Sequence, residues 1–165
     1  MSSINVSKQS LKKSIKRLIL LFIFGLVISG LTAFPVETLL SILTNWVDQS
    51  GINNPLTGWV GKVYEGVRLT NANYPFLAYG TDWLAFAHLV IAIAFLGPLK
   101  DPVKNIWIID WQIICCVAVL PLALIAGPIR QIPIFHIVID CSFGILGIIP
   151  LLICKRWIKQ LEKQQ

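Results

Sequence analysis

The dominant feature of the chain is a set of four apolar runs separated by more polar segments. The runs cover residues 18–34, 82–99, 105–126 and 133–154. An α-helix needs about 20 mainly apolar residues to cross the hydrocarbon core of a bilayer, and each run is close to that length. The last three runs are joined by short connections, which make neighbouring helices antiparallel. The pattern therefore predicts an all-α, polytopic membrane protein whose domain 18–154 is a four-helix antiparallel transmembrane bundle.

The segment 36–80, between the first two runs, has a different pattern. Pro35 ends the first run, and two stretches follow in which apolar residues recur at helical spacing with polar residues opposite. The first stripe extends from Val36 to Val47 and the second from Leu56 to Val67. Both stretches are too short and too polar to cross a membrane. We expect two amphipathic helices that lie on the membrane surface and cap the outer face of the bundle.

The composition agrees with a lipid environment. Of the 165 residues, 56% are hydrophobic and 13% are charged, whereas a soluble domain has about 25% charged residues. This balance excludes a disordered chain and an ordinary cytosolic enzyme. The net charge of +6 does not indicate nucleic-acid binding, because the basic residues lie beside apolar runs, mainly at the chain ends and in one short loop.

The placement of these basic residues predicts the orientation. Five lie in the N-terminal segment 1–17, two in the loop 99–104 and four in the C-terminal tail 155–165. With four spans, all eleven fall on one side of the membrane, and cytoplasmic loops carry an excess of Lys and Arg. We expect a bacterial inner-membrane protein with both termini in the cytoplasm, where 1–17 and 155–165 form basic extensions.

A cleaved signal peptide is the alternative for the first apolar run. The basic segment before the run is long for a signal peptide. Leu31-Thr32-Ala33 is also a poor cleavage site, because the residue at the −3 position should be small. We therefore expect residues 1–33 to be retained. Cleavage would leave the orientation of the later spans unchanged.

The last span carries polar residues at membrane depth. A charged group inside a span costs at least about 2.5 kcal/mol on insertion, so each one needs a reason. His136, Asp140, Gly144 and Gly147 share one helix face. Glycines on that face let another helix approach closely, so we expect the His–Asp pair to point into the bundle. His136 and Asp140 should lie about 5 and 11 Å below the outer end of the span.

The second span brings the other histidine to the same depth. His88 should lie about 9 Å below the outer end of its span, on a face of small and polar residues. Asp82 and Arg130 should lie just above it at the outer mouth, where Arg130 could bind a lipid phosphate. Glu37, Tyr74 and Tyr79 could join them. We predict an outer-facing site made by His88, His136 and Asp140, with Asp82 and Arg130 as ligand- or anion-binding residues at its rim.

Three kinds of chemistry fit this set. Two imidazoles and a carboxylate, from His88, His136 and Asp140, are a common ligand set for a transition metal such as Zn, Fe or Mn. The two histidines could instead be the axial ligands of haem b, although Asp140 would lie awkwardly close to the ring. The third is a catalytic acid–base pair in which Asp140 fixes the tautomer of His136. The structural alternative is that these groups only bond across helices and fix the packing.

Asp110 and the cysteines are not assigned to this site. Asp110 lies about one turn above the cytoplasmic end of its span, and we expect it to be paired, for example with Lys104 or Arg156. The four cysteines all fall in apolar runs and none belongs to a CxxC motif. We expect them to fill the core, which disfavours a disulfide-exchange enzyme.

Two functional hypotheses follow. In the first, the polar site binds a metal, a small ligand or a lipid headgroup, and acid–base or redox chemistry stays open, as does whether the protein is an enzyme. In the second, the protein is a non-catalytic accessory or assembly subunit of a larger membrane complex. Its surfaces would then dock a membrane-protein partner or a second copy of the chain.

Overall fold

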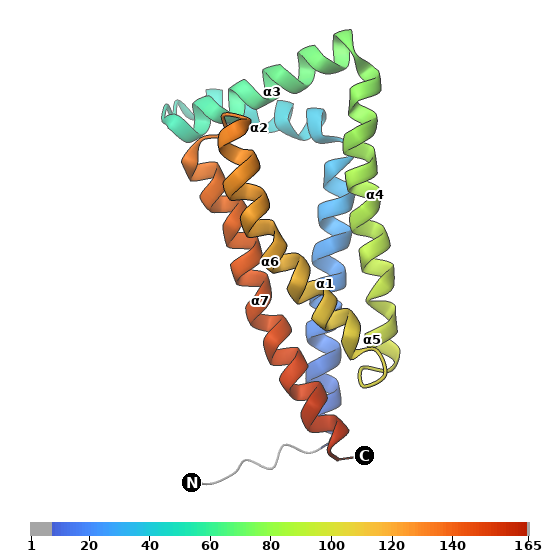
Figure 1. Cartoon of the computed structure of the whole chain (residues 1–165). Coiled ribbons are helices and arrows are strands. Elements are labelled where there is room, and N and C mark those ends of the chain that lie inside the picture. Colours follow the sequence, from blue (N-terminus) through green and yellow to red (C-terminus); the bar gives the residue numbers. More distant parts are fainter. Residues whose placement is uncertain (1–7, 165) are drawn as a thin grey trace. The chain divides into compact units, whose positions relative to one another are not determined.

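The computed structural model describes residues 8–164, which are helical throughout apart from short connections (Figure 1). No strand occurs in this range, so the all-α prediction is confirmed. The elements in chain order are α1 (Lys8–Ala33), α2 (Val36–Ser50), α3 (Pro55–Asn73), the 3₁₀ turn η1 (Pro75–Leu77), α4 (Ala78–Ala94), α5 (Leu96–Lys100), α6 (Ile106–Ile129) and α7 (Ile134–Glu162).

Four helical stretches are long and apolar enough to cross a membrane, as predicted. They are α1, the continuous segment Pro75–Lys100, α6 and α7. Several helices extend beyond the apolar runs that predicted them. The second stretch begins seven residues before Asp82, and α7 continues through most of the predicted tail to Glu162. The predicted basic N-terminal segment is likewise helical from Lys8 onward, and its first seven residues lie outside the described part of the chain.

The described residues fall into two compact units. Unit 1 combines residues 8–23 with 93–164, and unit 2 is Phe24–Ala92. Unit 1 therefore holds the first half of α1 together with α5, α6 and α7. Unit 2 holds the second half of α1, then α2, α3 and most of α4. Each unit is described by itself.

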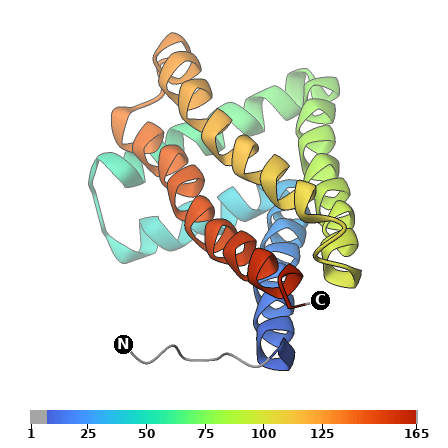
Figure 2. The same cartoon turned by 60° about the horizontal axis from the view of Figure 1, so that its bottom comes forward.

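Close packing of α6 against α7 organises unit 1. The two helices lie side by side in both views (Figure 1 and Figure 2). A Cβ on Gly144 would lie 2.6 Å from the backbone oxygen of Cys116, and one on Gly147 would lie 3.2 Å from its Sγ. Only glycine permits the approach at Gly144, because the opposing atom belongs to the backbone. This confirms that the Gly144–Gly147 face of the last span lies against another helix.

The ends of α1 and α7 meet within unit 1. Lys8 Nζ donates a hydrogen bond of 3.0 Å to the backbone oxygen of Gln164. Near this end, α1 buries Leu11, Ile15 and Ile19, which recur every fourth residue. The last part of α7 buries Leu151, Cys154, Ile158 and Leu161. Both helices are thus amphipathic here, with an apolar stripe buried in the unit.

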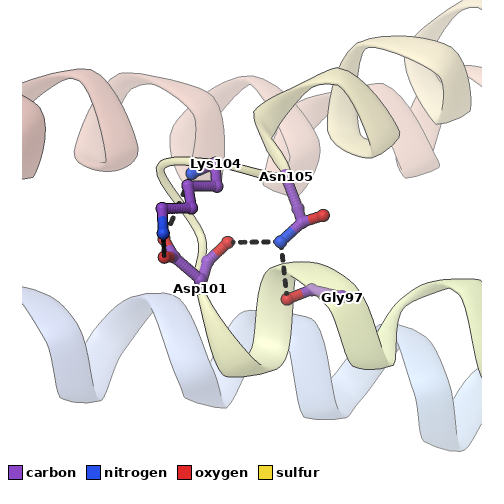
Figure 3. Close-up of polar contacts among 4 residues, drawn as sticks. All are labelled: Gly97, Asp101, Lys104 and Asn105. Atoms are coloured by element: carbon purple, nitrogen blue, oxygen red, sulfur yellow. Dashed lines mark hydrogen bonds and ion pairs between the residues drawn. The ribbon is translucent and has the colours of Figure 1, made fainter.

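Polar groups of the chain itself close the turn between α5 and α6 (Figure 3). Asn105 Nδ2 donates to the backbone oxygens of Gly97 at 3.2 Å and Asp101 at 2.9 Å. Asp101 Oδ1 accepts a hydrogen bond from the backbone N–H of Lys104 at 3.1 Å. Both carbonyls also accept a backbone N–H, from Asp101 and Asn105 respectively, so the side-chain bonds reinforce a turn that backbone bonds already close.

Unit 2 contains the α2–α3 hairpin. Gly51 ends α2 with a left-handed φ of 67°, a conformation that glycine adopts without steric cost. Asn54 then caps α3, since its side chain accepts from the backbone N–H groups of Leu56 and Thr57. In the same unit, a Cβ on Gly30 would lie 2.9 Å from the backbone oxygen of Ala85. The second half of α1 and α4 therefore pack at backbone distance.

Candidate functional site

A pocket of about 400 Å³ lies within unit 2, bordered by the start of α2, the second half of α3 and the start of α4. Its volume is in the range of small-molecule sites, about 300–1,000 Å³. The lining residues are Phe34, Pro35, Val36, Glu37, Thr38, Gly66, Val67, Thr70, Asn71, Leu77, Ala78, Thr81 and Asp82. The wall is thus part apolar and part polar, as in sites that orient a ligand by a few hydrogen bonds.

Two carboxylates give the pocket its electrostatic character. Glu37 lies in the first turn of α2, where the helix dipole favours a negative charge. Asp82 comes from the start of α4. Both side chains are half-buried, and the lining includes no Lys, Arg or His. The pocket is therefore acidic, and its other polar groups are threonine hydroxyls and one amide.

A hydrogen bond between helices holds Glu37 in place. Asn71 Nδ2 on α3 donates to Glu37 Oε2 at 2.6 Å. This bond occupies one oxygen of the Glu37 carboxylate, which lines the pocket. Sequence reasoning named Glu37 as a residue that could join the site but did not find Asn71. The sequence shows only that Asn71 is a polar residue on the predicted cap. It does not show which helix the Asn71 side chain faces.

The five predicted site residues are not all in this pocket. Asp82 lines it, and His88, six residues further along α4, does not. His88 Nδ1 instead lies 2.8 Å from the backbone oxygen of Leu84, one turn earlier in the same helix. With a proton on Nδ1, this contact is a hydrogen bond that leaves Nε2 as an acceptor. Arg130 is the C-cap residue that follows α6, and its backbone N–H donates to the backbone oxygen of Ala126.

His136 and Asp140 form the predicted pair on α7. Asp140 Oδ1 lies 3.8 Å from His136 Nε2, one helical turn away, and both side chains are about two-fifths exposed. The distance makes this an ion pair when the imidazole is protonated. The pair belongs to unit 1, whereas His88 belongs to unit 2. The proximity of His88 to His136 stays a prediction.

The metal and haem hypotheses are not supported. Residues 8–164 contain no group of three or more His, Cys, Asp and Glu side chains that could hold a metal ion. All four cysteines are free thiols, and Cys116 and Cys154 are buried. These two cysteines fill the core, as expected.

Asp110 is paired, as predicted, but with a different residue. Its Oδ1 lies 2.6 Å from Lys155 Nζ, an ion pair that joins α6 to α7. Lys104, one of the two partners named from the sequence, instead lies 3.8 Å from Asp101 on the α5–α6 turn. The packing of α6 against α7 brings Lys155 opposite Asp110. The spacing of Asp110 and Lys155 in the sequence does not predict this contact.

No protein-family model matches the chain, and no curated protein or solved structure is significantly similar to it.

Proposed function

We propose that the protein is a multi-pass protein of the bacterial inner membrane, with both termini in the cytoplasm and with the unit 2 pocket opening on the outer side. The distribution of basic residues supports this orientation. The hydrogen bond between Lys8 and Gln164 also supports it, because it holds the two ends of the described chain together.

The function that follows is the binding of a small polar molecule in that pocket. The observation that carries it is the presence of Glu37 and Asp82 in one pocket without a basic residue among its lining. Ionised carboxylates only accept hydrogen bonds. A ligand that suits them therefore presents hydrogen-bond donors, as an amine or a group of hydroxyls does. Such a ligand could be soluble or could be the headgroup of a lipid.

A binding experiment on the purified protein in neutral detergent tests this function. We expect ethanolamine or short-chain phosphatidylethanolamine to bind more tightly than acetate, which has no donor. Equal binding of free ethanolamine and the lipid would identify a soluble amine as sufficient. Binding of the lipid alone would identify a headgroup site.

Variants locate the binding in the pocket. Asp82→Asn and Glu37→Gln keep the side-chain size and remove the charge, and each should weaken binding by about tenfold or more. Asp48→Asn is the matched control, because Asp48 is an exposed carboxylate on α2 that does not line the pocket. Wild-type affinity in both pocket variants, or no binding of any donor-bearing probe, would refute the proposal.

The His136–Asp140 ion pair favours a second candidate, an acid–base role in the membrane. The 3.8 Å distance lets Asp140 orient the imidazole of His136 and fix its tautomer. In a strain whose phenotype depends on the protein, His136→Ala and His88→Ala should abolish function while the folded protein persists. If both keep full activity, and changes at Trp59 or Tyr64 on α3 are the damaging ones, the protein acts as an accessory subunit instead.

A further inference from the structure

The ends of α1 and α7 carry a concentrated positive surface. We define the basic surface as Lys12, Lys13 and Lys16 on α1 together with Arg156 and Lys159 on α7 and its C-cap residue Lys163, all of them exposed. The Lys8–Gln164 hydrogen bond joins the two segments within unit 1, and both views show the start of α1 and the end of α7 close together (Figure 1 and Figure 2). Two charge clusters far apart in sequence therefore form one surface.

Little within the two segments offsets this charge. Residues 8–17 contain no acidic residue, and residues 155–164 contain only Glu162. Among the described residues, no ion pair involves any of the six side chains of the basic surface. Their positive charge is left for a ligand outside the chain.

The burial of neighbouring apolar residues fixes the direction in which the lysine side chains point. Ile15 on α1 and Ile158 on α7 are completely buried, whereas Lys16 and Lys159, the next residues in sequence, are exposed. A helix turns by about 100° per residue, so burial of one residue constrains where the next one points. The lysines therefore cannot turn inward without taking the apolar stripe out of the core.

The aromatic residues place this surface at the level of lipid headgroups. Trp107 and Trp111 lie in the first two turns of α6 and are partly exposed. The ion pair of Asp110 with Lys155 brings these turns level with the last part of α7. Tryptophan is enriched where hydrocarbon meets headgroups. Basic side chains at or just beyond that level meet lipid phosphates.

We infer that the basic surface is a binding site for the headgroups of anionic phospholipids, formed jointly by α1 and α7. A lipid phosphate there neutralises charges on both helices at once and so stabilises their association. The inference goes beyond the pocket in unit 2 and does not rest on it, because the two sites share no residue.

Lipid retention by the purified full-length protein tests the inference. The protein in neutral detergent is titrated with phosphatidylglycerol and, separately, with phosphatidylcholine of the same chain length. Bound lipid is counted by native mass spectrometry, and the thermal midpoint is recorded. We expect selective retention of phosphatidylglycerol and a higher midpoint with it. Equal retention of the two lipids would overturn the inference.

Matched double variants locate the site. Lys12→Gln with Lys16→Gln, and Lys159→Gln with Lys163→Gln, each remove two charges and should each lower phosphatidylglycerol affinity about tenfold. The control is Lys62→Gln with Arg68→Gln, which removes two exposed charges from α3. If one basic double variant fails to fold, the other carries the test. Losses no larger than in the control would overturn the inference.

Two competitors distinguish the source of the anion. Full displacement of phosphatidylglycerol by inorganic phosphate would assign the surface to free phosphate and overturn the lipid site. Tight binding of polyglutamate without any preference for phosphatidylglycerol would assign it to an acidic protein segment, with the same consequence. Retention of phosphatidylglycerol against both supports the lipid site.

Discussion

Asn71 and Glu37 are 34 residues apart, and the amide Nδ2 of Asn71 donates a 2.6 Å hydrogen bond to the carboxylate Oε2 of Glu37. Both side chains line the unit 2 pocket. The bond connects α3 to α2 and orients one of the two acidic groups. Helix packing and pocket electrostatics therefore depend on the same contact.

The first prediction concerns this bond. Asn71→Ala should lower the free energy of unfolding by about 1–2 kcal/mol, because a half-buried carboxylate loses a charge-assisted donor. Thermal unfolding in detergent measures the loss. Asn73→Ala is the control, since Asn73 Nδ2 bonds only to the backbone oxygen of Leu69 in its own helix. Equal effects of the two substitutions would contradict a bond that couples α2 and α3.

The second prediction concerns the contact between α6 and α7. Gly144→Ala places a methyl group 2.6 Å from the backbone oxygen of Cys116. Since neither backbone can yield locally, the helices must separate, which should cost about 3 kcal/mol or more. Gly25→Ala on α1 is the control, because nothing lies within 4 Å of its added Cβ. A comparable unfolding midpoint for the two variants would contradict the close packing.

These contacts show where sequence analysis succeeded and where it stopped. Hydropathy predicted four spans because a membrane helix must be long and apolar whatever it packs against. The glycine pattern identified the packed face of the last span, because Gly144 and Gly147 share a face in any helix. The predicted second span begins at Asp82, whereas the helical stretch that contains it begins at Pro75, because hydropathy locates the apolar core of a helix and not its ends.

The candidate pocket could not be predicted to the same extent. Asp82 was named as a rim residue because it begins the predicted second span, just above the level of His88, and Glu37 was named only with Tyr74 and Tyr79 as a residue that could join the rim. Asn71 was missed because its role depends on how α3 lies against α2. The partner of Asp110 was wrong for the same reason, since Lys155 reaches it through the packing of two helices.

The third prediction concerns the ion pair between Asp110 and Lys155. In a double-mutant cycle of Asp110→Asn and Lys155→Met, each single substitution should destabilise the protein, and the double variant should cost less than their sum. We expect a coupling free energy of about 1–2 kcal/mol, because the charges are half-buried at the end of a membrane helix pair. Chemical unfolding in detergent supplies the four free energies.

The matched control is the same double-mutant cycle applied to the ion pair between Asp101 and Lys104. That pair lies 3.8 Å apart, and the Lys104 side chain is 84% exposed. Solvent screening should reduce its coupling to below about 0.5 kcal/mol. Additive effects at Asp110 and Lys155, or a larger coupling in the control, would show that the 2.6 Å contact does not stabilise the helix pair.

The fourth prediction tests the number of membrane crossings. Single cysteines are introduced by Ser10→Cys, Ala72→Cys and Gln164→Cys in a background whose four native cysteines are replaced by alanine. Positions 10 and 164 should stay unlabelled by an impermeant thiol reagent in intact cells and react after lysis, whereas position 72 should react in intact cells. The Lys8–Gln164 bond requires positions 10 and 164 to behave alike. Opposite labelling of these two would mean an odd number of crossings, and labelling of both without lysis would reverse the orientation and place the pocket on the cytoplasmic side.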